Sequence, residues 1–190
     1  MKTIAIDLDD TLNNFWETLQ TSAFEPDDAS GLEANIFSGY LARLRSDARE
    51  ESDLLSTEFT YFKARIHQLC YQRAAARADG VEFVRRLKRE GWRVVICTYR
   101  DLRRAGAVTR RWLDDNAIPF DHLFMAANKI VFCRAWRIPH LVDDDPFNIV
   151  HGPAHGVNVY YPILPRHAGL ATGPARGFHS FNEIMPWIQG

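Results

Sequence analysis

The chain has 190 residues, of which 46% are hydrophobic and 12% aromatic, and its formal net charge is −1. This length and apolar content suit one globular domain with room for a subdomain insert, and they exclude a disordered chain. The near-zero charge gives no sign of a nucleic-acid polymer or a membrane surface as a partner. No apolar run is long enough to span a bilayer, and the N-terminus lacks a signal-peptide core, so we expect a cytoplasmic protein.

The cysteines and histidines give no metal site or disulfide framework. Cys70, Cys97 and Cys133 are odd in number, widely spaced and mostly in apolar surroundings. We expect them to be reduced packing residues. The seven histidines show no metal-ligand spacing and are given no role.

The first predicted element is a short buried strand. Ile4, Ala5 and Ile6 form an apolar run that stops abruptly at Asp7. A buried strand of a parallel sheet ends in this way at its exposed carboxyl end.

A long insert follows this strand, over residues 15–78. Its middle, 25–56, is polar and irregular in period, whereas residues 57–77 favour a long helix. The side chains near heptad spacing in that helix are Phe59, Phe62, Ile66, Leu69 and Arg73. Crossovers between parallel strands are usually far shorter. We therefore expect a small helical cap at 15–78 and a core made of 1–14 and 79–190, with a long surface excursion as the alternative.

Helices and strands alternate along the rest of the chain. Asp79 and Glu82 form a predicted capping box for a helix over 79–90, which Gly91 ends. The elements expected after it are a strand at 92–97, a helix from 102 to about 115, a strand at 123–126, a helix at 128–136, strands at 138–142 and 157–161, a Pro- and Gly-rich loop at 163–177, and a capping box of Ser180 and Glu183 before a helix through Ile188. This alternation predicts a doubly wound, Rossmann-like α/β fold, in which helices cover both faces of a parallel sheet.

Three of the predicted strands end in polar residues, namely Asp7, Thr98 and Asp143. Ligands of such sheets bind beyond the carboxyl ends of the strands. The convergence of these side chains is therefore the first indication of a functional site.

Asp7, Asp9 and Thr11 form a D-x-D-x-T pattern directly after the first strand. Two carboxylates separated by one residue can take different roles at a strand end. One can bind a metal and attack a substrate, while the other protonates a leaving group. An ordinary acidic turn is the alternative, and the position after a buried strand favours the chemical interpretation.

Thr98 and Lys129 supply groups that could hold a phosphate. The Thr98 hydroxyl and nearby backbone amides can bind phosphate oxygens, although a threonine after a strand is commonly a cap or turn residue. Lys129 is the only lysine after Lys88. A compact ammonium can neutralise both a nucleophilic carboxylate and a phosphoryl oxygen, while a solvated lysine is the alternative.

Asp143, Asp144 and Asp145 gather three carboxylates at another strand end. Packed near Asp7 and Asp9, they would repel strongly unless a divalent cation lay among them. Oxygen ligands favour Mg²⁺ over zinc or copper. An acidic helix N-terminus before a proline explains one of the three carboxylates but not all of them.

The order of these residues resembles the haloacid dehalogenase superfamily of phosphohydrolases. The four motifs of that family match Asp7 to Thr11, then Thr98, then Lys129, then the pair Asp143 and Asp144. Three stretches are similar to its 5′(3′)-deoxyribonucleotidase group, which also carries a helical cap after the first motif. These stretches are Thr98-Tyr99-Arg100, residues 109–113 and residues 141–148.

The resemblance implies a role for each matching residue. Asp7 would be the nucleophile that forms an aspartyl-phosphate, Asp9 the general acid and base, and Lys129 the bridge between Asp7 and the phosphate. The phosphate-binding residues would be Leu8, Thr98, Tyr99 and Lys129. The Mg²⁺ ligands would be Asp7, the backbone carbonyl of Asp9, Asp144 directly and Asp143 through a water.

The predicted function is Mg²⁺-dependent hydrolysis of a small-molecule phosphate monoester, with nucleoside 5′- or 3′-monophosphates as the leading substrates. A phosphatase for sugar phosphates or other metabolites, a phosphotransferase and a non-catalytic phosphate-binding protein are the alternatives. Arg100 could contact substrate, lie on the surface or form a structural ion pair. The aromatic residues that could stack on a base, or instead form the core of the cap, are Phe15, Trp16, Phe24, Phe37 and Tyr40.

Overall fold

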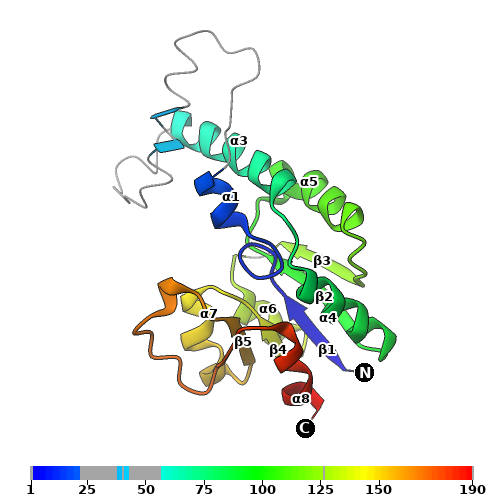
Figure 1. The fold of residues 1–190 in the computed structure, drawn as a ribbon. Coiled ribbons are helices and arrows are strands. Elements are labelled where there is room, and N and C mark those ends of the chain that lie inside the picture. The colour runs from blue at the N-terminus through cyan, green and yellow to red at the C-terminus, as the bar shows by residue number, and fades with distance from the viewer. Residues whose placement is uncertain (1, 22–37, 40, 43–56, 126, 190) are drawn as a thin grey trace.

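A computed structural model describes residues 2–21, 38–39, 41–42, 57–125 and 127–189. A six-stranded sheet in the order β3-β2-β1-β4-β5-β6 forms its centre, and every neighbouring pair of strands is parallel (Figure 1). The strands are β1 (Thr3–Ile6), β2 (Arg93–Thr98), β3 (His122–Met125), β4 (His140–Val142), β5 (Asn158–Pro162) and β6 (Arg176–Phe178). The predicted doubly wound α/β fold is confirmed.

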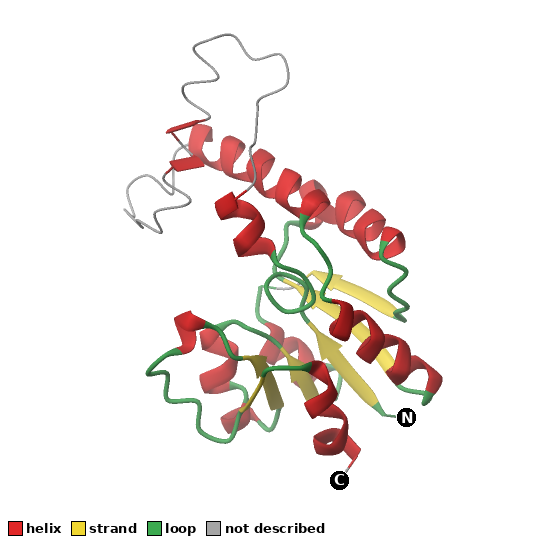
Figure 2. Cartoon of the chain, viewed as in Figure 1, coloured by secondary structure: helices red, strands yellow, loops and turns green. Residues whose placement is uncertain are grey.

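Helices cover both faces of the sheet because successive residues of each strand point to opposite faces. Ile4 and Ile6 pack into one core with side chains of α4, α5 and α8, while Ala5 packs into a second core with side chains of α6 and α7 (Figure 2). These helices are α4 (Ala78–Arg89), α5 (Leu102–Asp115), α6 (Lys129–Ala135), α7 (Pro146–His151) and α8 (Ile184–Gln189). The buried strands therefore carry apolar residues on both faces, as expected of a parallel sheet.

The register of the central strands aligns their carboxyl ends. Ile6 of β1 pairs with Ile96 of β2 on one side and with Val142 of β4 on the other. Asp7 and Asp143 each follow directly after an aligned residue. The strand ends predicted to carry the site therefore meet at one edge of the sheet.

The predicted capping box at α4 is wrong. The helix begins at Ala78, and its N-cap residue, Arg77, makes no side-chain capping bond. Asp79 instead accepts hydrogen bonds from the amides of Gly80 and Phe181, and Glu82 pairs with Arg89, the last residue of the helix. The second box, at Ser180 and Glu183, is confirmed, but it begins a 3-10 turn (Phe181–Glu183) that leads into α8.

The segment at 163–177 is not wholly a loop, as we had expected. It contains a 3-10 helix, Pro165–His167, and the first residues of β6. β6 pairs in parallel with β5, and a side chain at Gly177 would come within 3.0 Å of Tyr161 and 2.8 Å of Ile163. The glycine that favoured a loop is thus required by close packing inside a short strand. Helix α7 was not among the predicted elements, but the acidic helix N-terminus considered for one of the three aspartates is present, because Asp145 is the N-cap of α7.

Two helices of the insert are described, α1 (Phe15–Thr21) and α3 (Thr57–Arg73). α3 ends before the predicted residue 77, and in Figure 1 it runs beside α5. The division into a core at 1–14 and 79–190 and a cap at 15–78 stays a prediction. The aromatic residues Phe24, Phe37 and Tyr40 lie outside the described residues.

All three cysteines are buried and free, as predicted. None of the helices in the described ranges combines the length and apolar character that crossing a membrane would need.

Candidate active site

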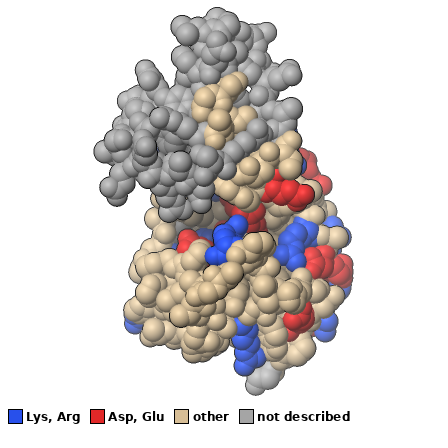
Figure 3. All heavy atoms as spheres, turned by 60° about the vertical axis from the view of Figure 1, so that its left-hand side comes forward, with Lys and Arg blue, Asp and Glu red and all other residues tan. Residues whose placement is uncertain are grey.

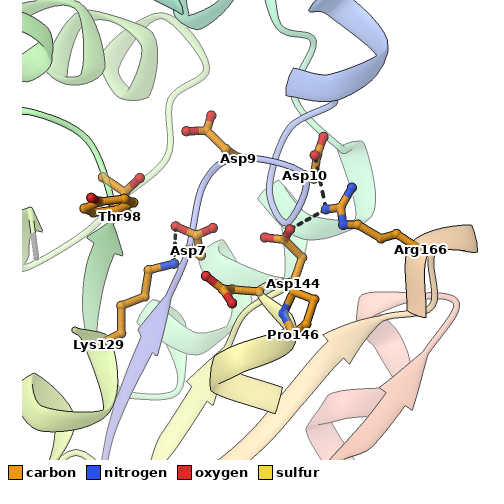
Figure 4. A pocket seen from close by; sticks show the side chains of 10 residues that line it. Asp7, Asp9, Asp10, Thr98, Lys129, Asp144, Pro146 and Arg166 are labelled. Atoms are coloured by element: carbon orange, nitrogen blue, oxygen red, sulfur yellow. Dashed lines mark hydrogen bonds and ion pairs between the residues drawn. The ribbon is translucent and has the colours of Figure 1, made fainter. Parts of the chain in front are cut away.

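The site lies where the loops after β1 and β4 meet. Asp7, Asp143 and Asp144 each direct a carboxylate oxygen to a common point, and these oxygens all lie within 4.8 Å of one another. Asp7 is 4% exposed and Asp143 is fully buried. Figure 4 shows Asp7 and Asp144 facing the same cavity from different strands. The predicted clustering of carboxylates at the sheet edge is therefore present.

Lys129 is a cation in direct contact with two acids of this cluster. Its Nζ lies 2.9 Å from Asp7 Oδ1 and 2.9 Å from Asp143 Oδ2, and its side chain is almost fully buried. Lys129 is the first residue of α6, and the Asn128 side chain caps that helix by accepting a bond from Val131 N. The cap fixes the first turn and hence the starting point of the lysine side chain.

Asp143 and Asp144 differ in how they are held. Besides Lys129, Asp143 accepts bonds from Asn148 Nδ2 at 2.9 Å and from the amide of Asp145 at 3.0 Å. Asp144 accepts a bond from Thr11 Oγ1 at 3.1 Å and forms an ion pair with an arginine described below. Asp143 is the more firmly fixed of the two. Which of them would bind a metal directly stays a prediction.

Thr98 Oγ1 is a buried polar atom at the site with no hydrogen-bond partner among the described residues. Asp7 Oδ1, by contrast, has the ammonium of Lys129 as its partner, at 2.9 Å. Buried polar groups are almost always satisfied, so the exception at Thr98 points to a missing ligand in the cavity. A hydroxyl suits a phosphate oxygen.

Asp9 takes no part in the carboxylate cluster. Both of its oxygens are bound by Arg100, with Nε 2.8 Å from Oδ2 and Nη2 2.5 Å from Oδ1. In Figure 4 its carboxylate points away from Asp7, although it still lines the cavity. Arg100 itself is buried and paired with Asp9, which excludes the surface arginine among the three interpretations offered by the sequence.

The phosphate-binding residues predicted from the sequence are only partly together. Thr98, Tyr99 and Lys129 line the cavity, and Tyr99 is 73% exposed at its mouth. The side chain of Leu8 is fully buried in the core and does not line the cavity. Any contact from this residue to a phosphate would therefore come from its backbone.

Arg166 is a site residue that the sequence did not reveal. It lies in the 3-10 helix after β5, and its Nη2 pairs with Asp144 and, at 3.1 Å, with Asp10 Oδ2. Figure 4 shows the guanidinium between the two acids, and Figure 3 shows acidic and basic side chains side by side across the middle of this face. The only sequence signal was a cation in a segment with no regular pattern.

Burial dominates the electrostatics of the cluster. It raises the pKa of Asp7 from its usual 3.8 to about 7, because the opposing effect of Lys129 is outweighed by burial and by the charges of Asp144 and Asp9. Burial is also the largest cause of the raised pKa values of Asp143 and Asp144. Burial acts to lower the pKa of Lys129, but Asp143 and Asp7 outweigh it, so the net shift is upward and the lysine stays charged.

Two connected cavities are present. The first, of about 520 Å³, contains the cluster, and the second, of about 650 Å³, shares Asp10, Asp144 and Arg166 with it. The second is the more apolar, and its lining includes Phe15, Trp16, Leu164 and Pro165.

Sequence comparisons find no match, either to a protein-family model or to a curated protein. Comparison with solved structures does find matches. A haloacid dehalogenase-like hydrolase from Streptococcus pneumoniae superposes with a TM-score of 0.66 at 14% identity, over 100% of this chain and 99% of that one. The chain has the haloacid dehalogenase fold.

Two further structures share the haloacid dehalogenase fold. A predicted phosphoglycolate phosphatase from Haemophilus somnus superposes with a TM-score of 0.62 at 17% identity, covering 98% of this chain and 97% of that one. A protein assigned as a HAD hydrolase from Bacillus subtilis, solved with bound magnesium, gives a TM-score of 0.59 at 14% identity, covering 100% and 99%. At such identities the likeness concerns the fold, and function has to be argued from the site.

Proposed function

We propose that this protein is a Mg²⁺-dependent phosphatase of the haloacid dehalogenase superfamily that hydrolyses a phosphate monoester through an aspartyl-phosphate at Asp7. The observation that carries the proposal is the environment of the Asp7 carboxylate. Its carboxylate is buried, lines the cavity, and has the buried ammonium of Lys129 2.9 Å from Oδ1. A carboxylate held in this way can face both a cation and an electrophile.

The residues support a two-step reaction. Asp7 attacks phosphorus, the bond to the leaving oxygen breaks, and Asp9 gives a proton to that oxygen. Water then attacks the phosphorus and gives a proton to Asp9, the bond to Asp7 breaks, and inorganic phosphate leaves. Lys129 stays charged throughout and lies where it can offset negative charge on both Asp7 and a phosphoryl oxygen.

The residues present fit a magnesium ion. Asp7, Asp143 and Asp144 supply oxygen ligands only, and one ligand oxygen of each lies within 4.8 Å of the other two. Bound there, Mg²⁺ would supply the positive charge that offsets repulsion between the carboxylates and the phosphate. The fold shared with hydrolases, one of them solved with magnesium, supports this part of the proposal.

For the substrate we propose a nucleoside 5′- or 3′-monophosphate, as in the 5′(3′)-deoxyribonucleotidase group. The second cavity supports a leaving group with a planar apolar part, because it opens from the phosphate site and is lined by Trp16, which is 37% exposed. A sugar phosphate is the alternative substrate, and a phosphotransferase or a phosphate-binding protein the alternative function. The cytoplasmic location expected from the sequence belongs to the same proposal.

The test is a measurement of phosphate release from nucleoside monophosphates, sugar phosphates and an aryl phosphate, with Mg²⁺ and with a chelator. We expect turnover only with the cation and the highest kcat/KM on a nucleotide. Asp7→Asn is the matched control, since the amide is nearly isosteric but a poor nucleophile. It should fold normally and lose turnover on every substrate. Turnover by folded Asp7→Asn would exclude the nucleophile, and phosphate binding without turnover by the wild type would favour a binding protein.

A further inference from the structure

Arg100 has an unusual environment for a charged residue. Its side chain has no exposed area, and it comes from the loop directly after β2. Two of its nitrogens donate to the two oxygens of Asp9, and Nη1 donates to Thr109 Oγ1 of α5 at 2.9 Å. An arginine held by three hydrogen bonds, one of them to helix α5, has a single orientation, and so does the carboxylate that it binds.

The insert supplies the wall behind this arginine. The centre of the guanidinium lies 3.7 Å from the centre of the Tyr71 ring, which belongs to α3 and is buried. Tyr71 in turn packs against the rings of Phe15 and His67, at 5.4 and 6.0 Å between centroids. The stacked ring closes the face of the guanidinium and keeps water from it.

A purely structural ion pair does not account well for this arrangement. Burying a guanidinium is unfavourable, and apolar residues of similar volume often stabilise a fold as much. Structural pairs of this kind usually bury both partners, whereas the Asp9 side chain is 24% exposed and lines the cavity of the site. The buried charge is thus used to orient a carboxylate that remains open to the substrate cavity.

We propose that Arg100 is a positioning residue for Asp9, and that α3 takes part in the chemistry by holding Arg100 through Tyr71. This inference rests on the proposed function, because it assigns Asp9 the transfer of a proton to the leaving oxygen. Asp7 and Asp9, the residues that react, lie outside the insert. The inference adds that the insert contributes to proton transfer through Tyr71.

The leaving group makes this role measurable. An alkyl phosphate releases a strongly basic alkoxide, so cleavage depends on the proton from Asp9. An aryl phosphate with an acidic phenol releases a stable anion and needs little help. The ratio kcat/KM reports the steps up to departure of the leaving group, so slow hydrolysis of the aspartyl-phosphate does not affect it.

The decisive variant is Arg100→Lys, which keeps the charge but cannot grip both oxygens or stack in the same way. We expect kcat/KM to fall about 100-fold on an alkyl phosphate, the scale of a misplaced catalytic group. For an aryl phosphate with an acidic phenol, kcat/KM should change less than about 3-fold, because the chemical step does not depend on the proton from Asp9. In an Asp9→Asn background, the same change should have no further effect on the alkyl phosphate. Arg103→Lys, at an exposed position of α5, is the matched control and should leave both ratios unchanged.

The contribution of α3 is tested at Tyr71. Tyr71→Phe keeps the ring beneath the guanidinium, and Tyr71→Leu removes it while preserving an apolar contact. We expect Tyr71→Leu to reproduce the selective loss on the alkyl phosphate and Tyr71→Phe to behave like the wild type. Melting temperatures of all variants identify any that fail to fold.

An equal loss on both substrates would mean that Arg100 serves only the structure, and it would overturn the inference while leaving the phosphatase proposal intact. Additive losses from Arg100→Lys and Asp9→Asn would overturn it as well. A wild-type protein that hydrolyses neither ester would instead refute the proposed function itself.

Discussion

Lys129 is the residue on which the stability of the carboxylate cluster depends most. It contacts two of the three clustered acids and is buried with them. Its removal leaves like charges facing each other without a partner. We expect Lys129→Met to lower the free energy of unfolding by roughly 3–5 kcal/mol in chelator, the usual effect of breaking a buried ion pair from one side.

The matched control is Lys88→Met. Lys88 pairs with Asp121 at 2.6 Å, but both side chains are about one-third exposed, so the loss should be at most about 1 kcal/mol. Urea unfolding with and without Mg²⁺ measures both variants. Mg²⁺ should restore part of the loss at Lys129 and none at Lys88. Equal losses in the two variants would contradict the account of the cluster.

Phe15 and Trp16 differ in role, although the sequence offered them together as base-stacking residues. Both side chains line the second cavity, but the Phe15 ring packs edge-on against His67 and tilted against Tyr71, whereas Trp16 is more exposed. We expect Trp16→Ala to remove roughly 1–3 kcal/mol of nucleotide binding, the scale of base–aromatic stacking, with little change on a small aryl phosphate.

Phe15→Ala should behave differently. Loss of its packing should lower the melting temperature and reduce activity on both substrates alike. KM values for a nucleotide and an aryl phosphate, measured beside the melting temperature, separate the two patterns. A selective nucleotide effect at Phe15 and none at Trp16 would reverse our assignment.

The sequence identified the central site residues because they carry a local signal. Asp7, Thr98 and Asp143 each end an apolar run, and a parallel sheet necessarily brings such ends together. The pairing of Arg100 with Asp9 and that of Arg166 with Asp10 join residues far apart in the chain. Nothing in the local pattern indicates such contacts, and a single charged residue in a loop is usually solvated. These partners therefore became visible only in the structure.

At the scale of elements, those that carry an apolar run, a helical period or a capping box were predicted, whatever their length. The five predicted strands are all present with ends shifted by up to two residues. β6 has the sequence Arg-Gly-Phe and thus no apolar run, and the six residues of α7 show no helical period. The capping box predicted at Asp79 is absent because the Asp79 carboxylate accepts a hydrogen bond from the amide of Phe181 instead. Phe181 is remote in sequence, so the local pattern could not indicate this contact.

Helix α4 approaches the loop of the nucleophile closely at Gly80. A Cβ there would lie 2.8 Å from Leu12 Cδ2 and 3.0 Å from the Phe181 ring. Leu12 belongs to the turn that closes onto the carbonyl of Leu8, directly after Asp7. We expect Gly80→Ala to destabilise the protein by roughly 1–3 kcal/mol, as overpacking in a core does, and to lower kcat by displacing this turn.

Gly106→Ala is the control for helix propensity. Gly106 lies inside α5, where an added Cβ meets only Leu102 Cδ1, at 3.4 Å. Here the substitution should stabilise the protein by about 0.5–1 kcal/mol, because it only removes the conformational freedom of glycine. Chemical denaturation and steady-state kinetics compare the two. If Gly80→Ala also stabilised the protein, the contact of α4 with Leu12 and Phe181 would not require a glycine, and the prediction would be wrong.

For the whole molecule, the sheet places like charges at the edge where the substrate must bind. Each strand end is positioned by the apolar cores on its two sides, so the acids cannot move apart without unpacking a strand. The folded state without a cation therefore contains repulsion that the unfolded chain does not have. Stability and metal binding are linked for this reason.

Asp7 makes this linkage measurable as a pH dependence. Its pKa in the folded state is about 7, against 3.8 when unperturbed. The folded protein then binds this proton more tightly than the unfolded chain. The contribution of Asp7 to stability is complete below the unperturbed pKa and is lost as the pH rises toward 7, by at most about 4 kcal/mol. Asp143 and Asp144, whose pKa values are also raised, act in the same direction.

We therefore expect Asp7→Asn, which cannot ionise here, to be more stable than the wild type in chelator at about pH 8, and this advantage to shrink toward about pH 5. Saturating Mg²⁺ should reverse the order at about pH 8, because the cation binds the ionised carboxylates of the folded wild type and the amide of the variant binds it less well. Thermal unfolding of both proteins at the two pH values, with chelator and with Mg²⁺, gives the four differences needed. Carboxylates outside the cluster titrate in the same way in both proteins, so their effect cancels when the stability of one protein is subtracted from that of the other. A difference that stays constant with pH in chelator would mean that Asp7 ionises normally in the fold, and the repulsion argued from its burial would be absent.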